Sequence, residues 1–176
     1  MKPATLALTI IGKDRPGIVG TVSDTVLAGG GNWEDSRMAR LGGWFAGILL
    51  VTVEADRADA LAASLAALES QGLRIVVERA EPRGPAAELR HVRLELVGQD
   101  HAGIVRDISR ALAERGINVE ELETEREAAP MGGGDLFRAL LEISAPPEVP
   151  LAELRSALEA LANDLMVDLS VVAQGD

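Results

Sequence analysis

The sequence feature that most constrains the fold is an internal repeat. The segment at 12–19, GKDRPGIV, returns 86 residues later as GQDHAGIV at 98–105. The same offset pairs Gly30 with Gly116 and Asn32 with Asn118, without a gap. A match of this length, ending each time in a glycine turn and an asparagine, indicates two copies of one structural unit.

The repeat divides the chain into two small domains. A length of 176 residues suits one ordinary domain or two small ones, and the repeat favours two. The stretch 81–88, EPRGPAAE, holds two prolines and a glycine between periodic segments, which is typical of a linker. We therefore predict a first domain at 1–80, a linker at 81–88 and a second domain at 89–176.

Hydrophobic periodicity predicts the same order of elements in both copies. In the first copy the pattern predicts strands at 4–11, 32–40, 44–53 and 73–77, with helices from Ile18 to Leu27 and from an N-cap at Asp56 to Gly72. In the second copy it predicts strands at 89–97, 117–126, 136–144 and 165–173, and helices at 103–115 and 150–163. The glycine-rich hairpin at 128–134 is the segment expected to be most mobile.

This order predicts an α+β fold. Each copy reads β-α-β-β-α-β, the ferredoxin-like arrangement in which two helices lie on one face of an antiparallel sheet. Hydrophobic residues make up 47% of the chain and aromatic residues only 2%, so the cores must be aliphatic. We expect two four-stranded sheets, or one continuous sheet if the copies pair edge to edge.

Composition excludes several kinds of chemistry. The chain has no cysteine, which rules out disulfides and thiolate chemistry and fits a reducing compartment. The first residues lack the apolar core of a signal peptide, and no apolar run approaches the length of a membrane span. We expect a cytoplasmic protein.

Charge argues against direct nucleic-acid binding. The net charge is −11, and residues 1–86 carry −1 of it while residues 87–176 carry −10. An acidic surface repels a phosphate backbone. Small molecules and proteins are therefore the expected partners.

The repeated turn is the strongest candidate for a binding site. Asp14 and Asp100 can each cap the following helix, and Gly17 and Gly103 let the backbone present free N–H groups, which favour a carboxylate. Asn32 and Asn118 can offer a donor and an acceptor to a zwitterion. The alternative is that all six residues only shape the turns in which they lie.

No constellation in the sequence indicates catalysis. His91 and His101 are isolated, and no nucleophile elbow or phosphate-binding glycine loop is present. The alternating carboxylates of 121–127 favour a solvated edge strand over a metal site. We expect no metal and no cofactor.

The repeated Asp-x-x-Gly-Ile-Val turns and the following asparagines make the chain resemble tandem ACT-domain proteins. Its opening is similar to that of the glycine cleavage system transcriptional repressor family. Formyltetrahydrofolate hydrolases also open this way, but their catalytic half is absent here. The resemblance implies that an amino acid binds at an interface between ACT units. The ligand-binding residues that it implies are Asp14, Arg15, Pro16, Gly17, Ile18, Val19, Asn32, Asp100, His101, Gly103, Ile104 and Asn118.

The resemblance implies a regulatory protein rather than an enzyme. The leading hypothesis is a homo-oligomeric amino-acid sensor, with glycine as the favoured ligand, that controls a transcriptional activator through protein contact. The alternatives are a regulatory subunit that modulates a metabolic enzyme in trans, and a small enzyme with an unrecognised site. The first copy is the expected binding site because the second has lost the proline and lies in the acidic half. Trp33, beside Asn32, is the expected fluorescent reporter.

Overall fold

The chain forms two compact units, residues 1–84 and 85–176. The structure is a computed structural model that describes residues 3–80, 89–128 and 134–172. The predicted linker, and the 129–133 part of the hairpin expected to be mobile, lie outside these ranges. Within the described ranges, no helix is long and apolar enough to cross a membrane. We call the two parts unit 1 and unit 2.

Unit 1 has the predicted order of elements. They are β1 (Pro3–Lys13), α1 (Ile18–Ala28), β2 (Asn32–Leu41), β3 (Trp44–Glu54), α2 (Ala58–Ala66), the 3-10 helix η1 (Ala67–Gln71) and β4 (Leu73–Ala80). The residue before α2 is Arg57 and no side chain caps this helix, so the predicted cap at Asp56 was wrong. The chain leaves η1 through Gly72, which has a left-handed conformation with φ 81°.

Unit 2 repeats the order. Its elements are β5 (Arg90–Gln99), α3 (Ile104–Ala113), β6 (Asn118–Ala128), β7 (Asp135–Ala145), α4 (Leu151–Leu165) and β8 (Val167–Val172). The sheets have equivalent strand orders, β2-β3-β1-β4 and β6-β7-β5-β8, and every neighbouring pair is antiparallel. The predicted fold, two ferredoxin-like β-α-β-β-α-β units, is confirmed.

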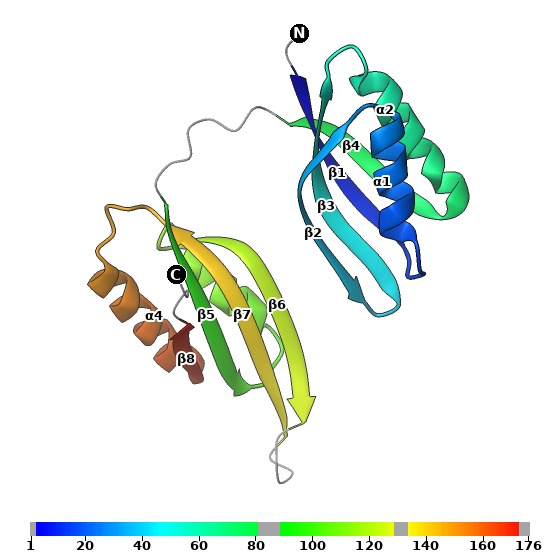
Figure 1. Ribbon diagram of the computed structural model, residues 1–176. Coiled ribbons are helices and arrows are strands. Elements are labelled where there is room, and N and C mark those ends of the chain that lie inside the picture. Colours follow the sequence, from blue (N-terminus) through cyan, green and yellow to red (C-terminus); the bar gives the residue numbers. More distant parts are fainter. Residues whose placement is uncertain (1–2, 81–88, 129–133, 173–176) are drawn as a thin grey trace. The chain divides into compact units, whose positions relative to one another are not determined.

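Two helices cover one face of each sheet (Figure 1). Alternate residues of the central strands point to this face, as Leu6, Leu8 and Ile10 do in β1, and each is at most 2% exposed. They pack with the buried side chains of the helices, chiefly Leu, Ile and Val, to form one aliphatic core in each unit. Leu61, Leu65 and Leu68, which are spaced at helical intervals along α2 and η1, belong to the core of unit 1.

The buried face of α1 is a narrow stripe. Ile18, Val22 and Val26 are buried, but Val19 is 47% exposed and Leu27 is 74% exposed. A helix lying flat on a sheet buries only the stripe at i, i+4 and i+8. The positions beside this stripe reach solvent.

The opposite face of each sheet, which we call the open face, differs between the units. In unit 1 the inner part of this face carries mainly small and apolar residues, namely Ala7, Thr9, Ile11, Ala46, Ile48, Leu50 and Val76. The equivalent positions of unit 2 carry Arg93, Glu95, Val97, Arg138, Leu140, Glu142 and Ser170. The two units thus share a core pattern but not a surface.

One glycine in β3 supports a test of the sheet packing. A Cβ on Gly47 would lie 2.4 Å from the Arg37 carbonyl oxygen and 2.8 Å from the Met38 Cα. Because these atoms are backbone, we expect Gly47→Ala to lower the free energy of unfolding by about 1–3 kcal/mol in urea denaturation. Gly20→Ala is the matched control, since a Cβ there meets nothing within 4 Å. Equal stability of both variants would contradict this packing.

Candidate functional site

The loop between β1 and α1 in unit 1 presents an uncapped helix start. Gly17 precedes the helix with φ 89° and ψ 0°, and no side chain caps the helix. The first helical bond runs from the Thr21 N–H to the Gly17 carbonyl, at 2.9 Å, so the N–H groups of the first turn have no intrahelical acceptor. A helix start of this kind favours an anionic group such as a carboxylate.

Asp14 does not cap this helix, contrary to the sequence prediction. The residue directly before the helix is Gly17, and Asp14 lies three residues earlier in the loop. The Asp14 N–H donates to the Gly43 carbonyl at 3.0 Å, and its carboxylate lies 3.6 Å from the Arg40 guanidinium. The aspartate therefore attaches the loop to the β2–β3 hairpin.

Unit 2 repeats this arrangement. Gly103 precedes α3 with φ 94°, and no side chain caps that helix either. The Asp100 N–H donates to the Asp135 carbonyl at 2.9 Å, and its carboxylate lies 3.6 Å from Arg126. The aspartates thus have the same structural role in both units, and the prediction that Asp100 caps α3 was also wrong.

Two side-chain contacts tie the loop of unit 1 and the adjoining end of β1 to neighbouring segments. Arg15 donates to the Gln71 carbonyl at 3.3 Å. The Lys13 ammonium lies 4.1 Å from the centre of the Trp44 ring, a cation–π contact. Because Trp44 is 43% exposed and adjoins the loop, it is a nearer fluorescent reporter than Trp33. Trp44 could not be chosen from the sequence, since its proximity to the loop follows from the β1–β3 pairing.

The first turn of α3 carries more charge than that of α1. Arg106 and Asp107 stand where α1 has Gly20 and Thr21, and the Arg106 Nε donates to the Asp107 Oδ1 at 2.8 Å. This hydrogen bond, with the nearby charges of Arg106, His101 and Arg110, lowers the pKa of the Asp107 carboxyl. An ionised carboxylate thus already lies at this helix start, where it repels a second one.

Asn32 and Asn118 each belong to a small polar network that sequence reasoning missed. The Asn32 amide donates to the Glu34 carboxylate at 2.8 Å, and the Thr52 hydroxyl donates to the same oxygen at 2.6 Å. Both Glu34 and Glu120 lie where the strand register shifts, at a β-bulge.

The network of unit 2 has the same geometry. Its members are Asn118, Glu120 and Ser144, and both partners again bond the glutamate carboxylate. The recurring Asn-x-Glu spacing, together with a hydroxyl on the neighbouring strand, could have indicated these networks.

The structure does not bring all the predicted site residues of unit 1 together. Residues 14–19 lie where β1 ends, whereas Asn32 pairs with Thr52, which pairs with Thr5 near the start of β1. At about 3.3 Å per residue, the eight residue steps from Thr5 to Lys13 separate these positions by roughly 26 Å. Asn32 and the loop of its own unit therefore cannot contact the same small ligand.

Unit 2 has the same separation. The loop residues His101, Gly103 and Ile104 follow β5, while Asn118 pairs with Ser144, which pairs with His91 near the start of β5. His101 is exposed, and its Nδ1 lies 3.3 Å from the Ala102 carbonyl oxygen. Ile18 and Ile104 are buried core residues, so they can contribute only backbone groups to a ligand.

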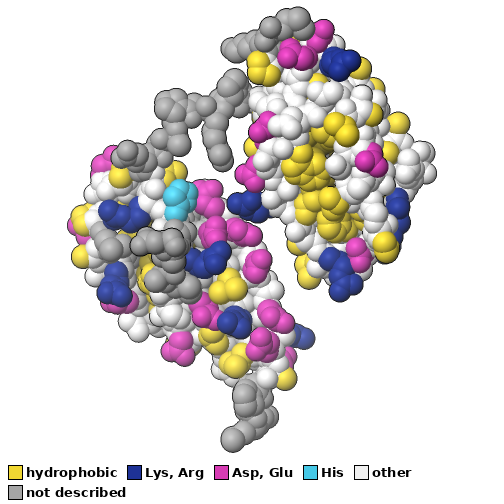
Figure 2. Space-filling model, in the orientation of Figure 1, with side chains coloured by type: hydrophobic (Ala, Val, Ile, Leu, Met, Phe, Trp, Pro, Cys, Tyr) yellow, Lys and Arg dark blue, Asp and Glu magenta, His cyan; other side chains and the backbone are white. Residues whose placement is uncertain are grey.

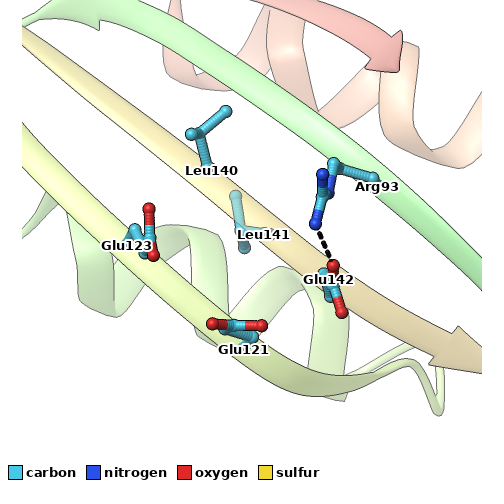
Figure 3. A pocket seen from close by; sticks show the side chains of 6 residues that line it. All are labelled: Arg93, Glu121, Glu123, Leu140, Leu141 and Glu142. Carbon is cyan, nitrogen blue, oxygen red and sulfur yellow. Dashed lines mark hydrogen bonds and ion pairs between the residues drawn. The ribbon is translucent and has the colours of Figure 1, made fainter. Parts of the chain in front are cut away.

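The alternating glutamates of β6 all point to the open face of unit 2. Glu121 and Glu123 line a shallow pocket of about 110 Å³ together with Leu140 and an ion pair between Arg93 and Glu142 (Figure 3). Among the described residues, no group of three or more His, Asp or Glu side chains could hold a metal ion. This pocket is open, is lined mainly by charged residues and lies away from the β5–α3 loop.

Comparison with known proteins agrees with the repeat. Residues 4–78 and residues 92–160 each match the ACT domain family. The chain is 27% identical over 169 residues to the glycine cleavage system transcriptional repressor of Escherichia coli K12, covering 94% of this chain and 88% of that protein.

Two solved structures superpose on nearly the whole chain. A protein of unknown function from Galdieria sulphuraria is 33% identical, with a TM-score of 0.79 and 97% and 98% of the two chains covered. A candidate glycine cleavage system transcriptional repressor is 22% identical, also with a TM-score of 0.79, and covers 100% of both chains. At that identity the second likeness shows the fold alone.

The Glu34 network supports a test by titration. The Thr52 hydroxyl and then the Asn32 amide lower the pKa of the Glu34 carboxyl. Its contribution to stability is therefore present above the unfolded pKa and is lost as the pH falls through the folded value. We expect Thr52→Val to raise the Glu34 pKa towards its ordinary value, measured by carboxyl NMR titration.

Thr5→Val is the matched control for this titration. Thr5 lies in the same row of the sheet, opposite Thr52, and forms no hydrogen bond with Glu34 in the described structure. An unchanged Glu34 pKa in Thr52→Val would contradict the network.

Proposed function

Because the chain belongs to the ACT-domain family, with one ACT domain in each unit, we propose that it is a non-catalytic, cytoplasmic, homo-oligomeric amino-acid sensor. It binds an amino acid at the β1–α1 loop of unit 1 and controls a transcriptional activator of glycine metabolism through protein contact. The similarity to the Escherichia coli repressor supports the regulatory part of this proposal.

The observation that carries the ligand site is the bare helix start after Gly17. Its first-turn N–H groups have no side-chain cap, and the positions that follow Val19 are Gly20 and Thr21, which add no charge. The Thr21 hydroxyl donates back to the Gly17 carbonyl at 3.0 Å, so it leaves the helix axis clear. A ligand carboxylate can approach these N–H groups directly.

Unit 2 is the weaker site on electrostatic grounds. Asp107 already places a carboxylate in the first turn of α3, and Arg106, the nearest cation in that turn, is paired with it. The Cβ that a substitution would add at Gly103 lies only 3.2 Å from Arg106, which shows how closely this side chain covers the loop. An incoming carboxylate must compete with Asp107.

We expect Gly17→Ala to weaken amino-acid binding more than Gly103→Ala does. Both glycines have positive φ, so each alanine costs about 1–2 kcal/mol of backbone strain, and the two variants are matched in that strain. Calorimetric titration with the twenty amino acids measures the binding. With about 1.5 kcal/mol per non-hydrogen atom as the ceiling, glycine reaches at best roughly micromolar affinity. Equal losses in the two variants would contradict the assignment to unit 1.

Fluorescence provides an independent readout of the same site. The chain has two tryptophans, and only Trp44 adjoins the loop. We expect ligand to change the emission of wild type and of Trp33→Phe but not of Trp44→Phe. A response that is lost in Trp33→Phe and kept in Trp44→Phe would place the ligand at the other end of the sheet.

Regulation through protein contact predicts that the isolated protein does not shift DNA. The open face of unit 2 carries the four glutamates of β6, at 121, 123, 125 and 127, and this face repels a phosphate backbone. In a gel shift at physiological salt we expect no retardation of duplex DNA. Retardation that disappears as salt is raised would contradict protein contact as the output.

A further inference from the structure

The open face of unit 1 leaves apolar surface in contact with water. Ile48 is 57% exposed and Val76 is 51% exposed, and both belong to one row of the sheet with Thr9 between them. Trp44 and Leu41, in the last row of the same face, are 43% and 83% exposed. Contiguous apolar surface of this kind is typical of an interaction site.

In unit 2 the equivalent face carries charged side chains, which suit it to contact with solvent. Arg93 pairs with Glu142 where unit 1 has Ala7 and Leu50, and the Arg138 Nε donates to Glu95 at 2.7 Å where unit 1 has Ala46 and Thr9. Figure 2 shows acidic and basic side chains interspersed over this face of unit 2. The charged side chains of this face would lose their hydration if the face packed against an apolar sheet.

We propose that the open face of unit 1 is the interface of a two-fold homodimer, packed against the same face of a second copy. The inference rests on the proposed self-association and names the surface that mediates it. It does not depend on amino-acid binding, which calorimetry measures separately.

The edge strand β4 indicates which partner fits. Arg74 and Glu78 point to the open face on either side of Val76, and neither forms an ion pair within the described structure. Consider a two-fold axis that lies between the two sheets, perpendicular to the strands and level with Val76. It places β4 of one copy over β4 of the other, with the two strands running in opposite directions. Arg74 of each copy then meets Glu78 of the other, and Val76 meets Val76.

The other face-to-face arrangement is disfavoured by the same charges. A two-fold axis along the strands would place β4 over β2 without reversing them, so that Glu78 would meet Asp35 of the other copy, because both lie in the row of Ala7 and Leu50. Like charges that face each other weaken an interface. The charges of β4 are thus complementary in the first arrangement only. In that arrangement Arg37 of β2, which lies in the row of Val76, meets Arg37 of the other copy, and each is paired with its own Asp35.

The available area is sufficient for a specific dimer. Four strands about 4.8 Å apart, each about ten residues long with a rise of about 3.3 Å, present roughly 600 Å² in projection. Standard interfaces bury about 800 Å² of accessible surface per partner, and a side-chain surface is larger than its projection. Sheets that pack face to face at about 10 Å have this geometry.

Charge reversal on β4 tests the proposal by sedimentation equilibrium. We expect wild type to dimerise, and Arg74→Glu and Glu78→Arg each to raise the dimer dissociation constant about tenfold. The double variant R74E/E78R restores both reciprocal pairs, so its constant returns to within about threefold of wild type. A double variant as weak as the product of the single effects would overturn the arrangement.

A substitution at the centre of the face tests the surface itself. We expect Ile48→Asp to produce a monomer, whereas Leu140→Asp, at the equivalent position of unit 2, leaves the dimer intact. Both sites are on the sheet surface, and circular dichroism verifies the folding of each variant. Wild type that is monomeric up to about 100 µM would overturn both the self-association and the interface. A dimer that persists in Ile48→Asp would overturn the interface alone.

Discussion

The rest of the structure depends on the burial of one face of each sheet under two helices. In both units this contact is aliphatic, and it buries the same alternate positions of the central strands, such as Leu8 in β1 and Leu94 in β5. The contact constrains every second residue of each strand and leaves the intervening residues free. The two units have therefore kept one core pattern while their open faces have become chemically different.

The sequence could predict the fold because its strongest signals are local. Alternation in the strands, the helical stripe at Leu61, Leu65 and Leu68, and glycine at the turns all act within one element. The β-α-β-β-α-β order in two copies then left little choice of topology. The exposure of Val19 and Leu27 could not be predicted, since it depends on the rotation of α1 about its own axis where it packs on the sheet.

The sequence predicted the candidate site less completely because its contacts join distant segments. The asparagine, glutamate and hydroxyl of each bulge network come from two strands, and Asp14 reaches Arg40 across the sheet from its own loop. An aspartate shortly before a helix looks like a cap, yet the left-handed Gly17 takes that position and directs the aspartate towards the hairpin. Recurrence in two copies indicates which residues are candidates, but not what they contact.

The proposed ligand loop and the open face of unit 1 share structural elements. Lys13 is the last residue of β1, its side chain packs on Trp44 at the end of the open face, and the next residue, Asp14, bonds the Gly43 carbonyl of the hairpin. A ligand that orders residues 14–17 therefore acts on the last row of the apolar sheet through two direct contacts. Linkage is reciprocal for binding free energies. If dimerisation raises the affinity of the loop for its ligand by some factor, the ligand raises the affinity of the two copies for each other by the same factor.

Unit 2 keeps the backbone contact of Asp100 but has Gln99 and Leu136 in place of the lysine and tryptophan, and charges cover its open face. If both proposals hold, the contacts that couple a bound amino acid to a change of assembly lie in unit 1, where the bare helix start and the apolar face occur together.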